Sequence, residues 1–109
     1  MRKPKFVTKS DMKDWLQSKS SLDIVGYACM PKSCVISMYF KELYPEAIFV
    51  HSGEEMTRLE FFVSKKIRIY DLDTPEWASL FIESIDESSR VYGQEVSAKL
   101  ALEILLSQK

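Results

Sequence analysis

The sequence predicts an α+β fold: a single small domain in which helices cover a mostly antiparallel sheet of three or four strands. Apolar residues recur at helical spacing in four segments, and four other segments have the length and the β-branched or alternating composition of strands. With 3 Gly and 4 Pro in 109 residues, the chain contains no evident linker. We therefore expect one domain over residues 1–109, in the order α-β-α-β-β-β-α-α, with residues 1–5 as a flexible basic tail.

The first two elements are a helix and a short strand. Thr8 and Asp11 have the spacing of a capping box, and three apolar residues follow on one face, so a helix is expected over residues 9–18. Residues 22–28 are apolar and include two β-branched side chains, which favours a strand. Gly26 within it predicts a bulge or a close approach of another backbone.

A second helix and a second strand follow. Ser33 is a good N-cap residue, and apolar side chains at helical spacing predict a helix over residues 33–43 that ends before Pro45. Residues 47–51 read as a strand. The step from strand 22–28 to this strand would be a right-handed crossover if both lie in one sheet; alternatively, the first strand lies outside the sheet.

Residues 57–63 and 67–72, joined by a tight turn, predict an antiparallel hairpin. Alternation places Leu59, Phe61 and Val63 on the inner face of the first strand, opposite Arg58, Glu60 and Phe62. On the second strand, Ile67 and Ile69 are expected to point inward. Phe62 and Tyr70 are then expected on the other face, where a partner would dock.

Two helices complete the chain. Thr74 is expected to cap the third helix, with Pro75 at its first position and its end near Asp86. Residues 87–95 are expected to form a loop, and Ser97 to cap the last helix.

Composition excludes several classes of protein. The formal net charge of −1 argues against a broad phosphate-binding face, and no apolar run is long enough for a membrane span. The basic N-terminus is not followed by the apolar run of a signal peptide. We therefore expect a cytoplasmic protein whose two cysteines are thiols.

The stretch GYACMPKSC, residues 26–34, is the strongest candidate for chemistry. Cys34 near a helix N-terminus, with Lys32 beside it, would favour a thiolate, and Cys29 would be its partner in a reversible disulfide. However, four residues separate the cysteines rather than the two of dithiol redox motifs, and His51 is not placed as an evident base. Catalysis by Cys29, Cys34 or His51 is therefore an alternative, and small core cysteines are favoured.

Neither a metal nor a cofactor is expected. Cys29, Cys34 and His51 lack the paired spacing of a zinc site, and no glycine-rich phosphate loop occurs. Asp71 and Asp73 with Glu76 would supply part of a cation site, but turn and helix-start roles explain these acids more simply.

Basic residues suggest a second alternative, a nucleic-acid-binding accessory protein. The residues concerned are Arg2, Lys3, Lys5, Lys9 and Lys13, which Lys65, Lys66 and Arg68 would extend. Such binding would weaken steeply with salt. The slightly acidic chain disfavours it.

The leading hypothesis is a small non-catalytic module for protein–protein interaction or regulation. The fold signals are strong, whereas no catalytic constellation is complete. The predicted docking surface consists of Arg58, Phe62, Arg68, Tyr70 and Lys32. The expected partner is another protein, and an exposed sheet edge would also allow two copies of the chain to pair.

Overall fold

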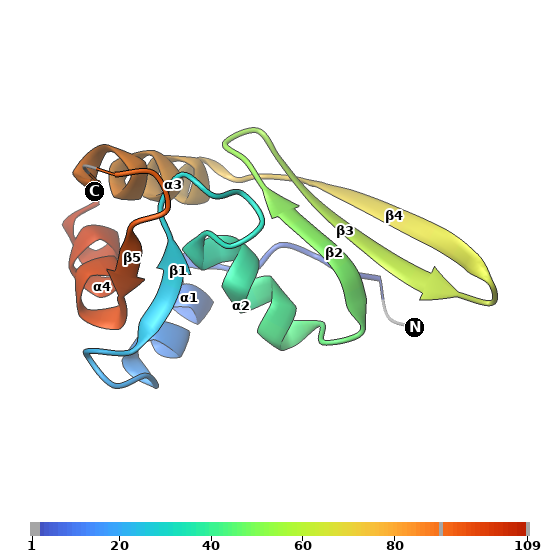
Figure 1. Cartoon of the computed structure of the whole chain (residues 1–109), viewed down its shortest axis with the longest axis horizontal. Coiled ribbons are helices and arrows are strands. Elements are labelled where there is room, and N and C mark those ends of the chain that lie inside the picture. The colour runs from blue at the N-terminus through green and yellow to red at the C-terminus, as the bar shows by residue number, and fades with distance from the viewer. Residues whose placement is uncertain (1–2, 90, 109) are drawn as a thin grey trace.

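The predicted α+β fold and its order of elements are confirmed, with one short strand added before the last helix (Figure 1). The computed structural model describes residues 3–89 and 91–108. Its elements are α1 (Lys9–Gln17), β1 (Ile24–Tyr27), α2 (Val35–Leu43), β2 (Ala47–Ser52), β3 (Met56–Val63), β4 (Lys66–Asp73), α3 (Glu76–Ser88), β5 (Glu95–Ser97) and α4 (Ala98–Ser107).

The strands form two antiparallel sheets. β2, β3 and β4 make a three-stranded sheet in chain order, and β1 pairs with β5 in a two-stranded sheet. The first predicted strand therefore lies outside the main sheet, as the second interpretation of the sequence proposed. β5 falls at the end of a segment predicted as a loop, because three residues are too short to show a strand pattern.

The hydrophobic core lies between the helices and the inner faces of both sheets. Its largest fully buried side chains come from every helix and from both sheets, and they include Met12, Leu16, Phe40, Phe61, Phe81 and Leu105. α2 lies between the two sheets (Figure 1). The β3–β4 hairpin reaches away from the helices and gives the molecule its long axis of 41 Å.

The N-terminal segment is attached to the core. Pro4 is buried, and the Phe6 ring packs edge-on against Phe40 at 5.1 Å and against Trp77 at 6.0 Å between centroids. The part of the expected tail that the structure describes, residues 3–5, thus contains one buried residue; residues 1 and 2 lie outside the described residues.

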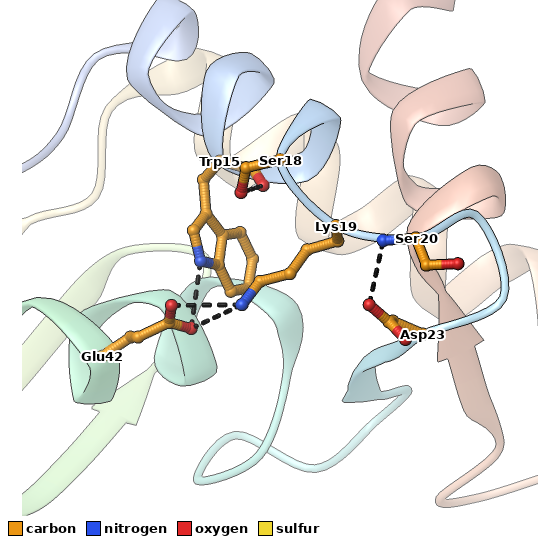
Figure 2. Close-up of polar contacts among 6 residues, drawn as sticks. All are labelled: Trp15, Ser18, Lys19, Ser20, Asp23 and Glu42. Atoms are coloured by element: carbon orange, nitrogen blue, oxygen red, sulfur yellow. Dashed lines mark hydrogen bonds and ion pairs between the residues drawn. The ribbon is translucent and has the colours of Figure 1, made fainter.

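A polar cluster joins the end of α1 to α2 (Figure 2). The Trp15 indole N–H donates to the Glu42 carboxylate at 3.0 Å, and Lys19 forms an ion pair with the same carboxylate at 3.1 Å. Trp15 also stacks on Tyr39 at 4.7 Å. This cluster fixes the direction in which the chain leaves α1 toward β1.

Local signals in the first helix and strand are confirmed. Thr8 and Asp11 form both hydrogen bonds of the capping box. Gly26 lies at a register shift in the β1–β5 pair, and a Cβ atom there would lie 2.6 Å from the Val35 nitrogen. The glycine thus serves both predicted purposes, the bulge and the close backbone approach.

Two helix starts are displaced by one residue from their prediction. Cys34, not Ser33, is the N-cap of α2, because the Ser33 carbonyl accepts a hydrogen bond from the Tyr27 N–H at 2.8 Å. Pro75 is the N-cap of α3; the Thr74 hydroxyl instead donates to the Gly53 carbonyl at 2.9 Å.

The inward direction predicted for β4 was wrong. Ile67 and Ile69 are exposed, whereas Tyr70 and Leu72 pack on the core. The turn decides this: Ser64 and Lys65 both have positive φ angles, 52° and 66°, as in a type I′ turn, and Val63 pairs with Lys66. A two-residue loop then places Phe62 opposite Ile67 on the outer face and Leu59 opposite Tyr70 on the inner face.

Candidate functional site

The candidate site is the outer face of the three-stranded sheet, the side turned away from the core. Strand register arranges its residues in rows: Phe62 beside Ile67; Phe49 beside Glu60 and Ile69; His51 beside Arg58 and Asp71; and Met56 beside Asp73. We call this surface the outer face. It combines apolar side chains with charged residues in every row but that of Phe62 and Ile67.

Phe62, Ile69, Ile67 and Met56 on the outer face are open to solvent, whereas Phe49 is half-buried. The exposed fractions are 61% for Phe62, 52% for Ile69, 50% for Ile67 and 43% for Met56. Because sheet faces that pack on a core bury such residues, a group of neighbouring exposed apolar residues is a feature of interaction surfaces.

An ion pair crosses the outer face. Arg58 donates from Nε and Nη2 to the two carboxylate oxygens of Asp71, at 2.7 and 2.9 Å. The Arg58 hydrogen bond, together with its positive charge, lowers the pKa of Asp71, and Asp71 raises the pKa of Arg58. Both partners are solvent-exposed, so the pair organises the surface and adds little stability.

A hollow of about 650 Å³ lies at one end of the outer face. Its walls include the apolar side chains of Phe49 and Met56, and four carboxylates, of Glu54, Glu55, Glu60 and Asp71. Arg58 is the only Lys or Arg in that lining, and it is already paired with Asp71. The hollow therefore offers apolar contact in a negative electrostatic environment.

Two further predicted residues adjoin the hollow. The His51 imidazole stacks parallel to the Phe49 ring with centroids 6.1 Å apart, and the Lys32 ammonium lies 5.1 Å from the centre of that ring. The Lys32 contact has the geometry of a cation–π interaction. Lys32 thus brings the loop of residues 26–34 to the edge of the outer face.

The structure divides the predicted docking surface. Arg58 and Phe62 lie on the outer face with Lys32 at its edge, whereas Arg68 and Tyr70 belong to the inner side of β4. Tyr70 packs edge-on against Phe61 at 5.8 Å, contrary to its expected place on the other face. The sequence did not lead us to predict Phe49, Ile67, Ile69 and Asp71 as members of this surface. A two-residue turn fixes which residues of β4 lie opposite which residues of β3, and it would have placed Ile67, Ile69 and Asp71 on the same face as Phe62 and Arg58.

The cysteines lie on a different side of β2. Cys29 follows β1 with a φ angle of 61°, and its N–H donates to the Asp86 carboxylate at 2.9 Å. Cys34 is buried, with its sulfur 3.6 Å from the Ser37 hydroxyl. Both cysteines are free thiols and line a hollow of about 260 Å³ together with Ser52 and Asp86.

The electrostatics of this hollow favour protonated thiols. Desolvation and the negative charge of Asp86 raise the pKa of Cys29. Burial raises the pKa of Cys34 more strongly than its hydrogen bonds with Ser37 lower it. These directions are opposite to those of an activated cysteine nucleophile.

His51 does not complete a cysteine site. Adjacent residues of a strand point to opposite faces, so Ser52 lines the cysteine hollow while His51 lines the hollow on the outer face. The geometry brings Cys29 and Cys34 to one place and separates His51 from them.

The remaining predicted groups fall into separate places. Within residues 3–89 and 91–108, no three His, Cys, Asp or Glu side chains gather in a metal-binding arrangement. Lys9 and Lys13 belong to α1, and Lys9 donates to the Gln108 carbonyl at 3.4 Å. Lys65 instead lies in the turn between β3 and β4, and Lys66 and Arg68 lie in β4. Arg2 lies outside the described residues.

None of the described helices has the length and apolarity needed to cross a membrane. Comparison with known proteins finds no matching family model, no matching curated protein and no matching solved structure.

Proposed function

We propose that this chain is a small non-catalytic interaction module that binds a segment of another protein on its outer face. The observation that carries the proposal is the continuous surface formed by Phe62, Ile67 and Ile69 beside the acidic hollow, which no other described element covers. Aromatic and aliphatic residues surrounded by charged ones are typical of the centre and rim of protein interfaces.

The chemistry of the hollow specifies the kind of segment. Four carboxylates surround the apolar walls, and the one guanidinium is paired with Asp71. Charge complementarity therefore favours a partner segment that carries Lys or Arg next to apolar side chains. The apolar side chains would pack on Phe62 and Phe49, and the cation would approach Glu54, Glu55 and Glu60.

A binding assay with designed peptides tests this proposal. Fluorescence anisotropy of labelled peptides measures the affinity for a basic–apolar peptide and for a matched peptide in which Glu replaces each Lys and Arg. We expect binding of the basic peptide only. Phe62→Ala should weaken it about tenfold, as for an aromatic residue at the centre of an interface.

Tyr92 supplies the matched control, because it is another exposed aromatic residue, in the segment between α3 and β5. Tyr92→Ala should leave the affinity unchanged. Equal binding of the acidic peptide, or equal losses from Phe62→Ala and Tyr92→Ala, would contradict the proposed surface.

A further inference from the structure

The cysteine hollow contains a hydrogen-bonding group that the fold does not use. Ser52 lines this hollow with only 2% of its surface exposed, and its hydroxyl has no hydrogen-bond partner among the described residues. A buried polar group without a partner costs stability, so such groups are rare in native proteins and call for an explanation. The hollow of about 260 Å³ has room for more than a single water molecule.

Hydrogen bonds between three segments fix the walls of the cysteine hollow. The Ser52 N–H donates to the Pro31 carbonyl at 3.0 Å, which joins the end of β2 to the loop of residues 26–34. The Cys29 N–H donates to the Asp86 carboxylate at 2.9 Å, which joins the same loop to α3. The hollow is therefore formed before any ligand enters, which lowers the entropic cost of binding.

The charged side chains of the cysteine hollow are acidic. Asp86 and Glu54 contribute carboxylates, and neither forms an ion pair with another residue in the described part of the chain. The lining, as far as the structure describes it, contains no Lys, Arg or His. Carboxylates at the walls of a cavity attract cations, because the surrounding protein replaces part of the screening water. These groups therefore favour a cationic ligand.

The apolar part of the lining favours a cation with an apolar stem. Met30, Pro31 and Ile82 form this part. A hard metal ion would require oxygen ligands on all sides, whereas the methylene stem of an alkylammonium or a guanidinium would pack against these side chains.

The hydrogen-bond acceptors favour an ammonium over a guanidinium group. An ammonium has three N–H donors, and the hollow offers the Asp86 and Glu54 carboxylates and the Ser52 hydroxyl. A guanidinium binds best to a carboxylate whose two oxygens are both free. Asp86 does not meet this condition, because its Oδ1 already accepts the Cys29 N–H.

The cysteine hollow adjoins the acidic hollow of the outer face. Gly53 and Glu54 line both, and they lie in the short connection between β2 and β3. We propose that the cysteine hollow binds the ammonium group of a Lys side chain, and that this Lys belongs to the segment bound on the outer face. The source of the ammonium group rests on the proposed function, whereas the binding of an ammonium group does not.

Titration with n-butylammonium, which reproduces the end of a Lys side chain, tests the hollow without a peptide. Two-dimensional proton–nitrogen NMR follows the Cys29 N–H, because this group donates to Asp86 at the wall of the hollow. We expect a shift that saturates in the millimolar range at constant ionic strength. n-Butanol has the same stem without the charge and should produce no such saturation. A Cys29 signal that n-butylammonium leaves unmoved would overturn the inference.

Asp86→Asn removes the charge of this side chain and keeps an oxygen that accepts the Cys29 N–H. It should weaken n-butylammonium binding about tenfold or more, as for the loss of a charge-assisted hydrogen bond. Glu87→Gln is the matched control, because Glu87 is the next residue of α3, is exposed and does not line the hollow. Equal affinities of the two variants would contradict the role assigned to Asp86.

Ser52→Ala separates a ligand-binding hydroxyl from a structural one. It should weaken n-butylammonium binding and leave the Tm unchanged or higher, because this hydroxyl has no partner within the described chain. Ser37→Ala is the control, since the buried Ser37 hydroxyl donates to the Pro31 carbonyl and its loss should lower the Tm. A lower Tm with unchanged binding in Ser52→Ala would count against the site.

Two apolar peptides that differ at one position identify the source of the ammonium group. One carries a single Lys, and the other carries norleucine, which keeps the stem and lacks the charge. The natural chain should bind the Lys peptide about tenfold more tightly, and Asp86→Asn should lose most of this preference. Phe62→Ala should weaken both peptides and keep the preference.

The inference and the proposed function can fail separately. Saturable binding of n-butylammonium without binding of either peptide would refute the proposed function and would make a free amine the ligand of the hollow. An equal preference for the Lys peptide in Asp86→Asn and in the natural chain would overturn the inference and leave the proposed function in place.

Discussion

At the scale of single residues, Gly26 is the position where local and tertiary requirements coincide. A Cβ atom there would lie 2.6 and 2.8 Å from the Val35 nitrogen and Cα, and 2.9 Å from the Cys34 carbonyl carbon. All three neighbours are backbone atoms at the start of α2, which cannot rotate away as a side chain would. The glycine therefore allows β1 and α2 to approach closely.

Gly26→Ala should destabilise the chain by about 1–3 kcal/mol or more, the usual cost of forcing extra volume into a packed interior. Urea denaturation measures this difference. Gly53→Ala is the matched control, because its nearest contact would be an ordinary 3.5 Å. Equal midpoints for the two variants would show that α2 moves away from β1 at little cost.

The cysteines provide a prediction about reactivity. Both thiols have a raised pKa, so alkylation at neutral pH should be slow and should accelerate only above the ordinary thiol pKa of about 8.5. Cys34 should react more slowly than Cys29, because it is buried. Rates measured across pH on the folded chain, with the urea-unfolded chain as control, check this. A rate that levels off below that pH would support the alternative of a thiol-dependent enzyme or redox sensor.

The same shifts have a consequence for stability. A thiol whose pKa is raised on folding favours the folded state below the pKa of the unfolded chain, and this contribution is lost as pH rises through the folded pKa. The free energy of unfolding should therefore fall at alkaline pH. Cys34→Ala should reduce that fall, which denaturation at a series of pH values would measure.

At the scale of elements, the β3–β4 hairpin has turn residues that its turn type does not favour. Its type I′ turn holds Ser64 and Lys65 at φ angles of 52° and 66°, a region that Asn and Gly adopt with less strain. This turn sets which residues of β3 and β4 lie opposite each other. It therefore also decides which residues of β4 belong to the outer face. The hairpin thus keeps a defined register despite unfavourable turn residues.

The double change Ser64→Asn with Lys65→Gly should stabilise the chain by about 0.5–1 kcal/mol, because it relieves strain at both turn positions. Thermal unfolding followed by circular dichroism should show a higher Tm. Lys66→Gly is the control: glycine at this first position of β4 should lower the Tm. A lower Tm for the double variant would mean that the turn is not of type I′.

At the scale of the whole molecule, the N-terminal segment closes the core between α2 and α3. Phe6 contacts Phe40 on α2 and Trp77 on α3. No pattern in the first eight residues predicts this contact, since it joins segments far apart in the chain. The segment is therefore part of the folded unit at Phe6.

Phe6→Ala should cost about 2–3 kcal/mol of unfolding free energy, somewhat less than the 3–5 kcal/mol typical of a fully buried phenylalanine, because Phe6 is half-buried. Phe62→Ala, which removes an exposed ring of the same size, should stay within about 0.5 kcal/mol. Urea denaturation of both variants compares them. Similar losses would show either that the N-terminal contact is weak or that Phe62 is part of the core.

The sequence by itself determined the features that depend on a few neighbouring residues. The capping box of Thr8 and Asp11, the Ser97 cap, the bulge at Gly26 and the end of α2 before Pro45 were all predictable, because each is a local hydrogen bond or a backbone restriction. The alternation of β3 was also predictable, since its inner residues Leu59, Phe61 and Val63 are apolar. From these follow the fold class and the order of elements.

Tertiary structure decided which elements meet and which side chains share a surface. β1 pairs with β5 from the other end of the chain, and Asp86 reaches Cys29 across 57 residues, so neither the second sheet nor the thiol pKa could be predicted locally. The residues of the outer face could be identified only once the register of β4 was known. Both faces of β4 carry apolar residues, so the alternation of its sequence does not show which face points inward. Long-range contacts depend on the packing of the whole chain, which no short window of sequence contains.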